Sequence, residues 1–112
     1  MQPNLPAGTV GTLRELLVAA DLMERGYHVF RAISPACPCD LVVQKDEVTL
    51  RVEVRSLRRN RIGYLYDGVT RSDIGNFDVV ANVAMDKTIR YATYDEAASR
   101  EQGRIVLAPY EP

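Results

Sequence analysis

The sequence predicts one α/β domain spanning residues 1–112, with a central mixed β-sheet flanked by helices in the order α-β-β-β-loop-β-β-α. Two patterns carry this prediction. Apolar residues recur at helical spacing over residues 12–25, and residues 48–55 alternate between apolar and polar as a half-buried strand does. A length of 112 residues suits a single domain with its own core, because most domains run roughly 50–250 residues.

The first half of the chain predicts one helix and three strands. Residues 1–10 contain two prolines and a glycine and read as an irregular arm. The helix over 12–25 ends at Gly26, since glycine often lies just past a helix terminus. Strands are expected over 27–33, 40–44 and 48–55. The apolar helix face expected in the core consists of Leu13, Leu16, Leu17, Ala20 and Met23.

The second half predicts two more strands, over 77–84 and 88–93, and a short helix over 94–101 that ends before Gly103. Residues 104–108 form a last short strand or an extended tail. Residues 56–76 show no clear period, and a gap this long inside a compact domain is usually a functional or mobile loop.

Composition sets limits on the function. The formal net charge is -1, so the chain has no overall positive charge that would indicate nucleic-acid binding. Of the 14 basic residues, however, 12 are arginine, which binds phosphate in a bidentate way that lysine cannot. Residues 51–61 hold five of these arginines against one acid, Glu53. Codon bias in a GC-rich genome explains the arginine excess equally well.

Neither a secretory leader nor a membrane-spanning run of about 18 apolar residues occurs in the sequence, which predicts a soluble, cytoplasmic protein. Cys37 and Cys39 are too close in sequence for an easy disulfide. With His28 they suggest zinc, but structural zinc usually needs four ligands, and His28 fits a strand residue better.

Two acids and a base stand out on the predicted strands 40–44 and 48–55. Asp40 starts the first strand, and Glu53 and Arg55 lie two residues apart on the second. Side chains alternate between the faces of a strand, so Glu53 and Arg55 point the same way. If the two strands pair as a hairpin, Asp40 stands near Glu53. Two carboxylates that converge in this way make a site for a hard cation such as Mg²⁺.

Each acid also has a simpler explanation. Asp40 comes shortly after Pro38 and fits a turn residue that caps local amides. Glutamate is depleted in strands, but Glu53 could lie on an exposed face and pair with Arg51 and Arg55.

Glu15 lies on the predicted helix. Residues 12–15 (TLRE) fit a capping box, in which the glutamate reaches back to an amide at the helix start. On a helical wheel, Arg14, Asp21 and Arg25 share a polar stripe, and Glu15 lies about 100° from Arg14 on an apolar flank. We expect that flank to face the sheet, where a carboxylate must be paired or metal-bound.

Residues 8–94 resemble the PD-(D/E)XK nuclease superfamily, most closely the small archaeal-type Holliday-junction resolvases and the intron-encoded homing endonucleases. The resemblance rests on the order of the acids Glu15, Asp40 and Glu53 along the chain. It also rests on the sequence of the predicted helix, which ends in a glycine followed by an aromatic residue, Gly26-Tyr27. The matching segments are residues 11–15 (GTLRE), 19–29 (AADLMERGYHV), 40–43 (DLVV), 52–56 (VEVRS) and 77–81 (FDVVA).

This resemblance implies a restriction-endonuclease-like domain that hydrolyses DNA phosphodiester bonds with Mg²⁺, or with Mn²⁺ in its place. It makes Asp40 and Glu53 the metal ligands, with the carbonyl of Val54 completing the set. Glu15 is then expected to hold a metal-bound water or a second metal. A divalent ion suits the reaction, because it lowers the pKa of bound water and neutralises the charge that develops on the phosphate.

Two positions depart from the superfamily pattern. Arg55 stands where the family has lysine, and Cys39 replaces the proline before Asp40. Arginine stays charged and cannot act as a general base, but it can stabilise charge in the transition state. The proline varies widely, so its loss is minor.

The loop after the second signature strand mixes arginine with tyrosine, which predicts a phosphate clamp with stacking rings. Its alternative is a solvated surface loop. The residues expected to bind DNA are Arg51, Arg58, Arg59, Arg61 and Tyr64. A domain this small rarely handles a long duplex alone, so we expect a homodimer or a higher homo-oligomer.

Three hypotheses follow. The first is a metal-dependent endonuclease in which Glu15, Asp40, Glu53 and Arg55 are catalytic. The second is a catalytically silent module that binds DNA, and the third is a nuclease-fold subunit that binds only protein.

Overall fold

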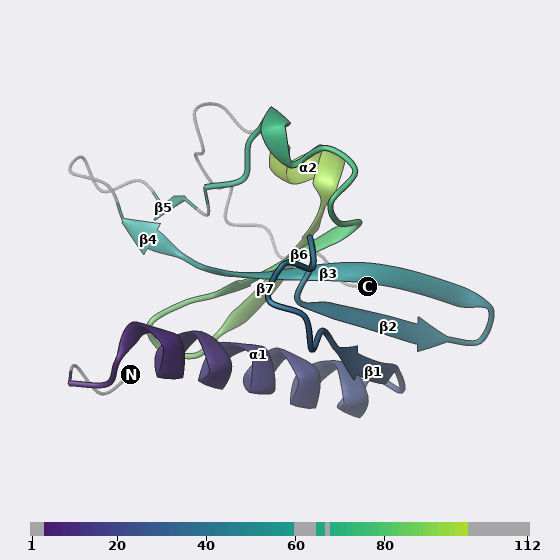
Figure 1. Ribbon diagram of the computed structural model, residues 1–112, viewed down its shortest axis with the longest axis horizontal. Helices are drawn as coiled ribbons and strands as arrows, with labels where there is room; N and C mark the ends of the chain where they lie inside the picture. Colours follow the sequence, from purple (N-terminus) through teal and green to yellow (C-terminus); the bar gives the residue numbers. More distant parts are fainter. Residues whose placement is uncertain (1–3, 60–64, 67, 99–112) are drawn as a thin grey trace.

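The computed structural model describes residues 4–59, 65, 66 and 68–98, and it places a helix on each face of a central β-sheet (Figure 1). The predicted α/β class with a mixed sheet flanked by helices is confirmed. The elements are α1 (Ala7–Glu24), β1 (His28–Arg31), β2 (Leu41–Lys45), β3 (Val48–Ser56), β4 (Arg58–Arg59), β5 (Leu65–Tyr66), the 3₁₀ helix η1 (Arg71–Asp73), β6 (Val79–Val83), β7 (Ile89–Thr93) and α2 (Tyr94–Ala98).

The main sheet has five strands in the order β1-β2-β3-β6-β7 within the described residues. Strands β1, β2 and β3 form an antiparallel meander, β3 pairs with β6 in parallel, and β6 pairs with β7 in antiparallel fashion. The parallel pair runs from Val52 opposite Val79 to Ser56 opposite Val83. Strands β4 and β5 form a separate two-stranded sheet inside the segment 56–76, for which the sequence predicted no regular structure.

Two hydrophobic clusters pack on opposite faces of the sheet. Under α1, Val18 and Leu22 pack against the inward-facing residues of β2, β3, β6 and β7. On the α2 side, Phe77, Val80 and Ala97 belong to a second cluster. All five residues of β6 are buried, as expected for a strand that is covered on both faces.

Helix α1 differs from its prediction at its start and in the face that it buries. It begins at Ala7, so Thr12 is not its N-cap and the predicted capping box around Glu15 is wrong. Of the five residues predicted to form its core face, only Leu17 packs against the cluster. Leu16 is 53 % exposed, and Leu13, Ala20 and Met23 are also exposed.

The rotation of α1 follows from a polar contact with the sheet. Asp21 accepts a hydrogen bond from Tyr91 on β7 at 2.5 Å and pairs with Arg25 at 3.0 Å. The Arg25 guanidinium lies over the Tyr91 ring, 5.3 Å from its centroid. Apolar residues surround much of this helix, so their spacing alone did not define one face.

The C-terminus of α1 matches its prediction. Gly26 has φ +93° and donates to the carbonyl of Met23, while Tyr27 donates to the carbonyl of Leu22. This is a Schellman motif, which needs the left-handed conformation that glycine adopts readily.

The remaining boundaries shift by a few residues. Strands β1 and β6 are shorter than the predicted 27–33 and 77–84, and α2 starts at the expected Tyr94. The predictions for residues 99–108 lie outside the described part of the chain. No helix among the described residues is long and apolar enough to cross a membrane.

Candidate active site

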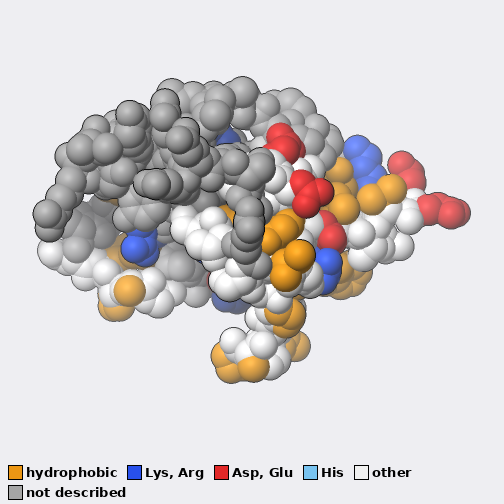
Figure 2. Space-filling view, turned by 90° about the horizontal axis from the view of Figure 1, so that it is seen from above, with side chains coloured by type: hydrophobic (Ala, Val, Ile, Leu, Met, Phe, Trp, Pro, Cys, Tyr) orange, Lys and Arg blue, Asp and Glu red, His pale blue; other side chains and the backbone are white. Residues whose placement is uncertain are grey.

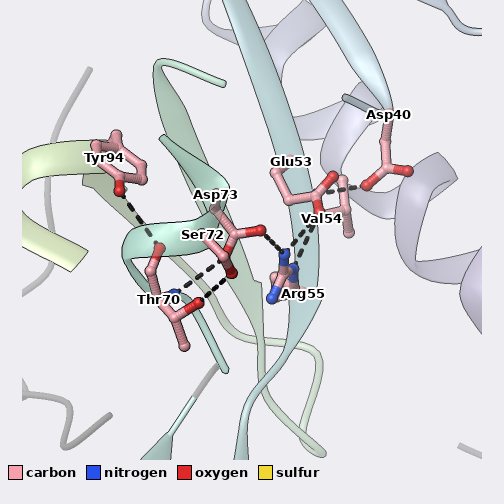
Figure 3. Close-up of polar contacts among 8 residues, drawn as sticks. All are labelled: Asp40, Glu53, Val54, Arg55, Thr70, Ser72, Asp73 and Tyr94. Atoms are coloured by element: carbon pink, nitrogen blue, oxygen red, sulfur yellow. Dashed lines mark hydrogen bonds and ion pairs between the residues drawn. The ribbon is translucent and has the colours of Figure 1, made fainter. Parts of the chain in front are cut away.

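Asp40 and Glu53 lie side by side on the α2 face of the sheet. Asp40 directly precedes β2, and its amide donates at 3.1 Å to the carbonyl of Val52, the residue that also lies opposite Leu41. Glu53 is the next residue on β3 and points to the same face, since side chains alternate along a strand. The hairpin that the sequence suggested therefore brings these two carboxylates together (Figure 3).

The Asp40 carboxylate is fixed across the hairpin. Its Oδ2 accepts a hydrogen bond from the amide of Val54 at 2.8 Å. This contact joins Asp40 to β3. The alternative prediction, that Asp40 caps amides within its own turn, does not account for this contact. In a β-strand the N–H and C=O of one residue face the same neighbouring strand, so the Val54 carbonyl also faces the Asp40 side.

Glu53 is a largely buried carboxylate with a strongly shifted titration. Its side chain is 17 % exposed. Burial, followed by the hydrogen bond and the charge of Asp40, raises the pKa of Glu53 to about 7, although Arg55 acts in the opposite direction. Two neighbouring carboxylates resist joint ionisation, and a bound cation would remove that resistance.

Arg55 bridges two carboxylates. Its Nε donates to Glu53 Oε2 at 3.0 Å, and its Nη2 lies 3.0 Å from the same oxygen and 3.3 Å from Asp73 Oδ1. Asp73 comes from η1, and Figure 3 shows it reaching Arg55 from that element, whereas Glu53 reaches Arg55 from β3. Asp73 is not among the site residues predicted from the sequence, because the segment around it has no hydrophobic period. The one available signal was the local Thr-x-x-Asp spacing of residues 70–73.

Glu15 occupies the neighbouring edge of the site. Its Oε1 accepts a hydrogen bond from Arg31 Nε on β1 at 3.0 Å, so it is a paired carboxylate on a sheet-facing flank, as predicted. Glu15 and Asp40 line one cleft of about 310 Å³, together with residues of the 31–39 segment. Glu53 is absent from the described lining of that cleft.

The donor set suits a hard cation that keeps part of its water shell. Among the described residues, no group of three His, Cys, Asp or Glu side chains has metal-binding geometry. Asp40 and Glu53 therefore provide two carboxylates, and the Val54 carbonyl is the third available oxygen. Mg²⁺ commonly binds proteins through one or two carboxylates, with water and substrate phosphate completing its coordination.

The cysteines do not provide a zinc site in the part of the chain that the structure describes. Cys37 is exposed and Cys39 is buried. Burial and the neighbouring Cys37 raise the pKa of the Cys39 thiol to about 11, so this thiol stays protonated at neutral pH. His28 lies exposed on β1, as a strand residue.

The residues expected to contact DNA differ in their surroundings, and two of them lie outside the described residues. Arg51 forms a bidentate pair with Asp78, with Nε to Oδ2 at 3.2 Å and Nη2 to Oδ1 at 3.0 Å, which holds the pKa of Asp78 below its usual range. Arg58 is exposed on β4. Arg59 also lies on β4, while Arg61 and Tyr64 fall outside the described residues. On the α2 side, the coloured atoms of Figure 2 show acidic and basic side chains interspersed.

No protein-family model matches the sequence, and no curated protein matches it. Solved structures do. The bacterial homing endonuclease I-Ssp6803I superposes with a TM-score of 0.68 at 14% identity, covering 82% of this chain and 72% of that one. Hjc, a Holliday junction resolvase from the archaeal hyperthermophile Archaeoglobus fulgidus, superposes with a TM-score of 0.57 at 18% identity, covering 75% of this chain and 79% of that one. These are the two kinds of nuclease that the sequence motif resembles, and the chain has the restriction-endonuclease-like fold that they share.

Proposed function

We propose that this protein is a divalent-metal-dependent endonuclease that hydrolyses DNA phosphodiester bonds. The observation that carries the proposal is the pair of adjacent carboxylates, Asp40 and Glu53, with Arg55 bonded to the second of them. The nuclease fold supports the same reaction class.

In this proposal Asp40, Glu53 and the Val54 carbonyl hold Mg²⁺ or Mn²⁺. When bound, the ion supplies an acidified water and a Lewis acid for the phosphate. Asp40 is kept in place by the Val54 amide, and Glu53 by Arg55. Glu15 faces the adjoining cleft and orients water or a second ion there.

Arg55 acts as a fixed positive charge in the proposed reaction. Its guanidinium does not lose a proton at physiological pH, so it does not serve as the general base. It lies beside Glu53, where it can stabilise the negative charge that develops on the phosphate oxygens. Arg58, Arg59, Arg61 and Tyr64 then contact the DNA backbone and bases. Arg51 contributes from the flank, with part of its binding capacity taken by Asp78.

The primary experiment incubates the purified protein with supercoiled, linear, single-stranded and four-way DNA, each with Mg²⁺, Mn²⁺ or a chelator. Metal-dependent cutting that disappears in both Asp40→Ala and Glu53→Ala is expected. Glu47→Ala, which changes an exposed acid in the β2–β3 turn, serves as the matched control and should cut normally. Cutting by Asp40→Ala at the wild-type rate would refute the assignment.

A second function has one specific observation in its favour. Arg55 is neutralised by two carboxylates, Glu53 and Asp73, which suits a structural role as well as a catalytic one. The alternative is a nuclease-fold module that binds DNA, or only a protein partner, without cleavage. Salt-sensitive DNA binding without any metal requirement would favour this module.

Two strands of a duplex require two cuts, so we further propose that the protein acts as a homodimer or a higher homo-oligomer. Light scattering with and without DNA tests this directly. A monomeric mass under both conditions would exclude it.

A further inference from the structure

The segment 68–76 closes over the guanidinium of Arg55. Its first residue, Gly68, lies so near that a Cβ added there would be 3.6 Å from Arg55 Nη1. Its 3₁₀ helix then contributes Asp73, whose Oδ1 lies 3.3 Å from Arg55 Nη2. Both partners are mostly shielded from water, with side-chain exposures of 25 % for Arg55 and 19 % for Asp73.

Asp73 is itself fixed on the side away from Arg55. Its Oδ2 accepts the amide of Thr70 at 2.9 Å, and the hydroxyls of Thr70 and Ser72 lie 2.7 Å apart. Tyr94, at the start of α2, donates to the Thr70 carbonyl at 3.3 Å. The Tyr94 ring packs edge-on against Phe77, 5.5 Å between centroids. Polar contacts therefore run from α2 through η1 to Arg55 and Glu53 (Figure 3).

This arrangement requires the shape of arginine. The guanidinium presents donors at Nε and at both Nη atoms in one rigid plane, so it can bond Glu53 and Asp73 at once. A lysine ammonium is a compact point charge on a flexible stem and lacks this fork. Asp73 therefore adds a second carboxylate contact to the one that Glu53 makes with the guanidinium plane.

We propose that Asp73 is a positioning residue, which holds the Arg55 guanidinium beside Glu53 and thereby lets arginine serve where the resembling nucleases carry lysine. The catalytic part of this inference rests on the proposed nuclease function. The structural part, that Asp73 sets the orientation of Arg55, does not.

A merely local role for Asp73 is the competing explanation, because it also caps the Thr70 amide. Asp73→Asn separates the two roles. The asparagine oxygen can still accept the Thr70 amide, whereas the negative charge that faces Arg55 is removed. Asp95→Asn, on the exposed first turn of α2, is the matched control for loss of one carboxylate.

The first test is steady-state cleavage with Mg²⁺. Asp73→Asn should lower kcat by roughly 10- to 100-fold with KM nearly unchanged, because the misplaced group acts on chemistry rather than on binding. Asp73→Glu should recover part of the loss, and Asp95→Asn should match the wild type. In an Arg55→Lys background, Asp73→Asn should have little further effect. Wild-type kcat in Asp73→Asn, or an equal loss in both backgrounds, would overturn the proposal.

The second test needs no cleavage. In ¹⁵N-labelled protein, the Arg55 Nε–H resonance should be resolved and protected from exchange in the wild type and in Asp95→Asn. In Asp73→Asn it should shift and lose protection. An unchanged signal would refute the positioning role. If the wild type cuts no DNA, the proposed function fails, and this resonance still decides whether Asp73 orients Arg55.

Discussion

The shifted titration of Glu53 predicts how stability depends on pH in the metal-free protein. Burial and Asp40 raise the pKa of Glu53 from its ordinary value of 4.5 to about 7. A carboxyl with a raised folded-state pKa stabilises the fold fully below its unfolded pKa, and this contribution is lost as the pH rises through the folded pKa. The window of loss therefore runs from about pH 4.5 to just above pH 7.

The size of the effect follows from the shift. One pKa unit corresponds to about 1.4 kcal/mol, so the shift of Glu53 amounts to about 3 kcal/mol of unfolding free energy. Because the side chain is 17 % exposed, solvent screening removes only part of this. Glu53→Gln mimics the protonated carboxyl and should abolish the dependence.

Urea unfolding followed by circular dichroism, with chelator present, measures this directly. The unfolding free energy of the wild type minus that of Glu53→Gln should fall by roughly 1–3 kcal/mol between pH 4.5 and pH 8. Taking the difference cancels the titrating groups that do not interact with Glu53. Mg²⁺ at pH 8 should then stabilise the wild type and leave Glu53→Gln nearly unchanged, since ligand binding to the folded state adds stability. If this difference in unfolding free energy does not change between pH 4.5 and pH 8, the pKa of Glu53 is not raised in the folded protein and the prediction is refuted.

Three further predictions test the site and the packing of α1. Asp40→Ala should abolish cleavage and spare DNA binding, measured by fluorescence anisotropy in Ca²⁺; loss of binding would show a role in the DNA interface instead. Arg58→Ala should weaken DNA binding alike for all sequences and lower the salt slope of log K by about 1, as expected for one phosphate contact. Leu22→Ala should cost about 2–5 kcal/mol of unfolding free energy, whereas Leu16→Ala, at a 53 % exposed position, should cost about 0.5 kcal/mol or less. Similar losses for both leucine variants would mean that the exposed face of α1 is covered in solution.

The sequence predicted the elements that have strong local signals. The alternation of residues 48–55 placed β3 almost to the residue, and Gly26 marked the end of α1. The proximity of Asp40 and Glu53 followed from hairpin geometry, which depends on a short turn and on a period of two. Each of these depends on residues close together in the chain.

The failures share a different cause. The rotation of α1 is set by the contact between Asp21 and Tyr91, which are 70 residues apart in the chain, and no helical period reveals such a pairing. The pairing of Arg51 with Asp78, which are 27 residues apart, is likewise not revealed by any local pattern. Tertiary contacts between distant polar residues override local pattern in both cases.

The topology explains why a third carboxylate reaches the site from the part of the chain that had no readable pattern. Strands β3 and β6 are parallel, so the connection from Ser56 must return along the sheet before Val79 can pair opposite Val52. Parallel neighbours always need such a crossover, unlike the tight turn that joins β2 to β3. The contact between Asp73 and Arg55 shows that the described segment 68–76 of this crossover lies over the face that carries Glu53. An acid in this segment can therefore reach the partly buried guanidinium of Arg55, as Asp73 does. In this fold the crossover is thus the place from which a carboxylate distant from the β2–β3 hairpin can reach the arginine that follows Glu53.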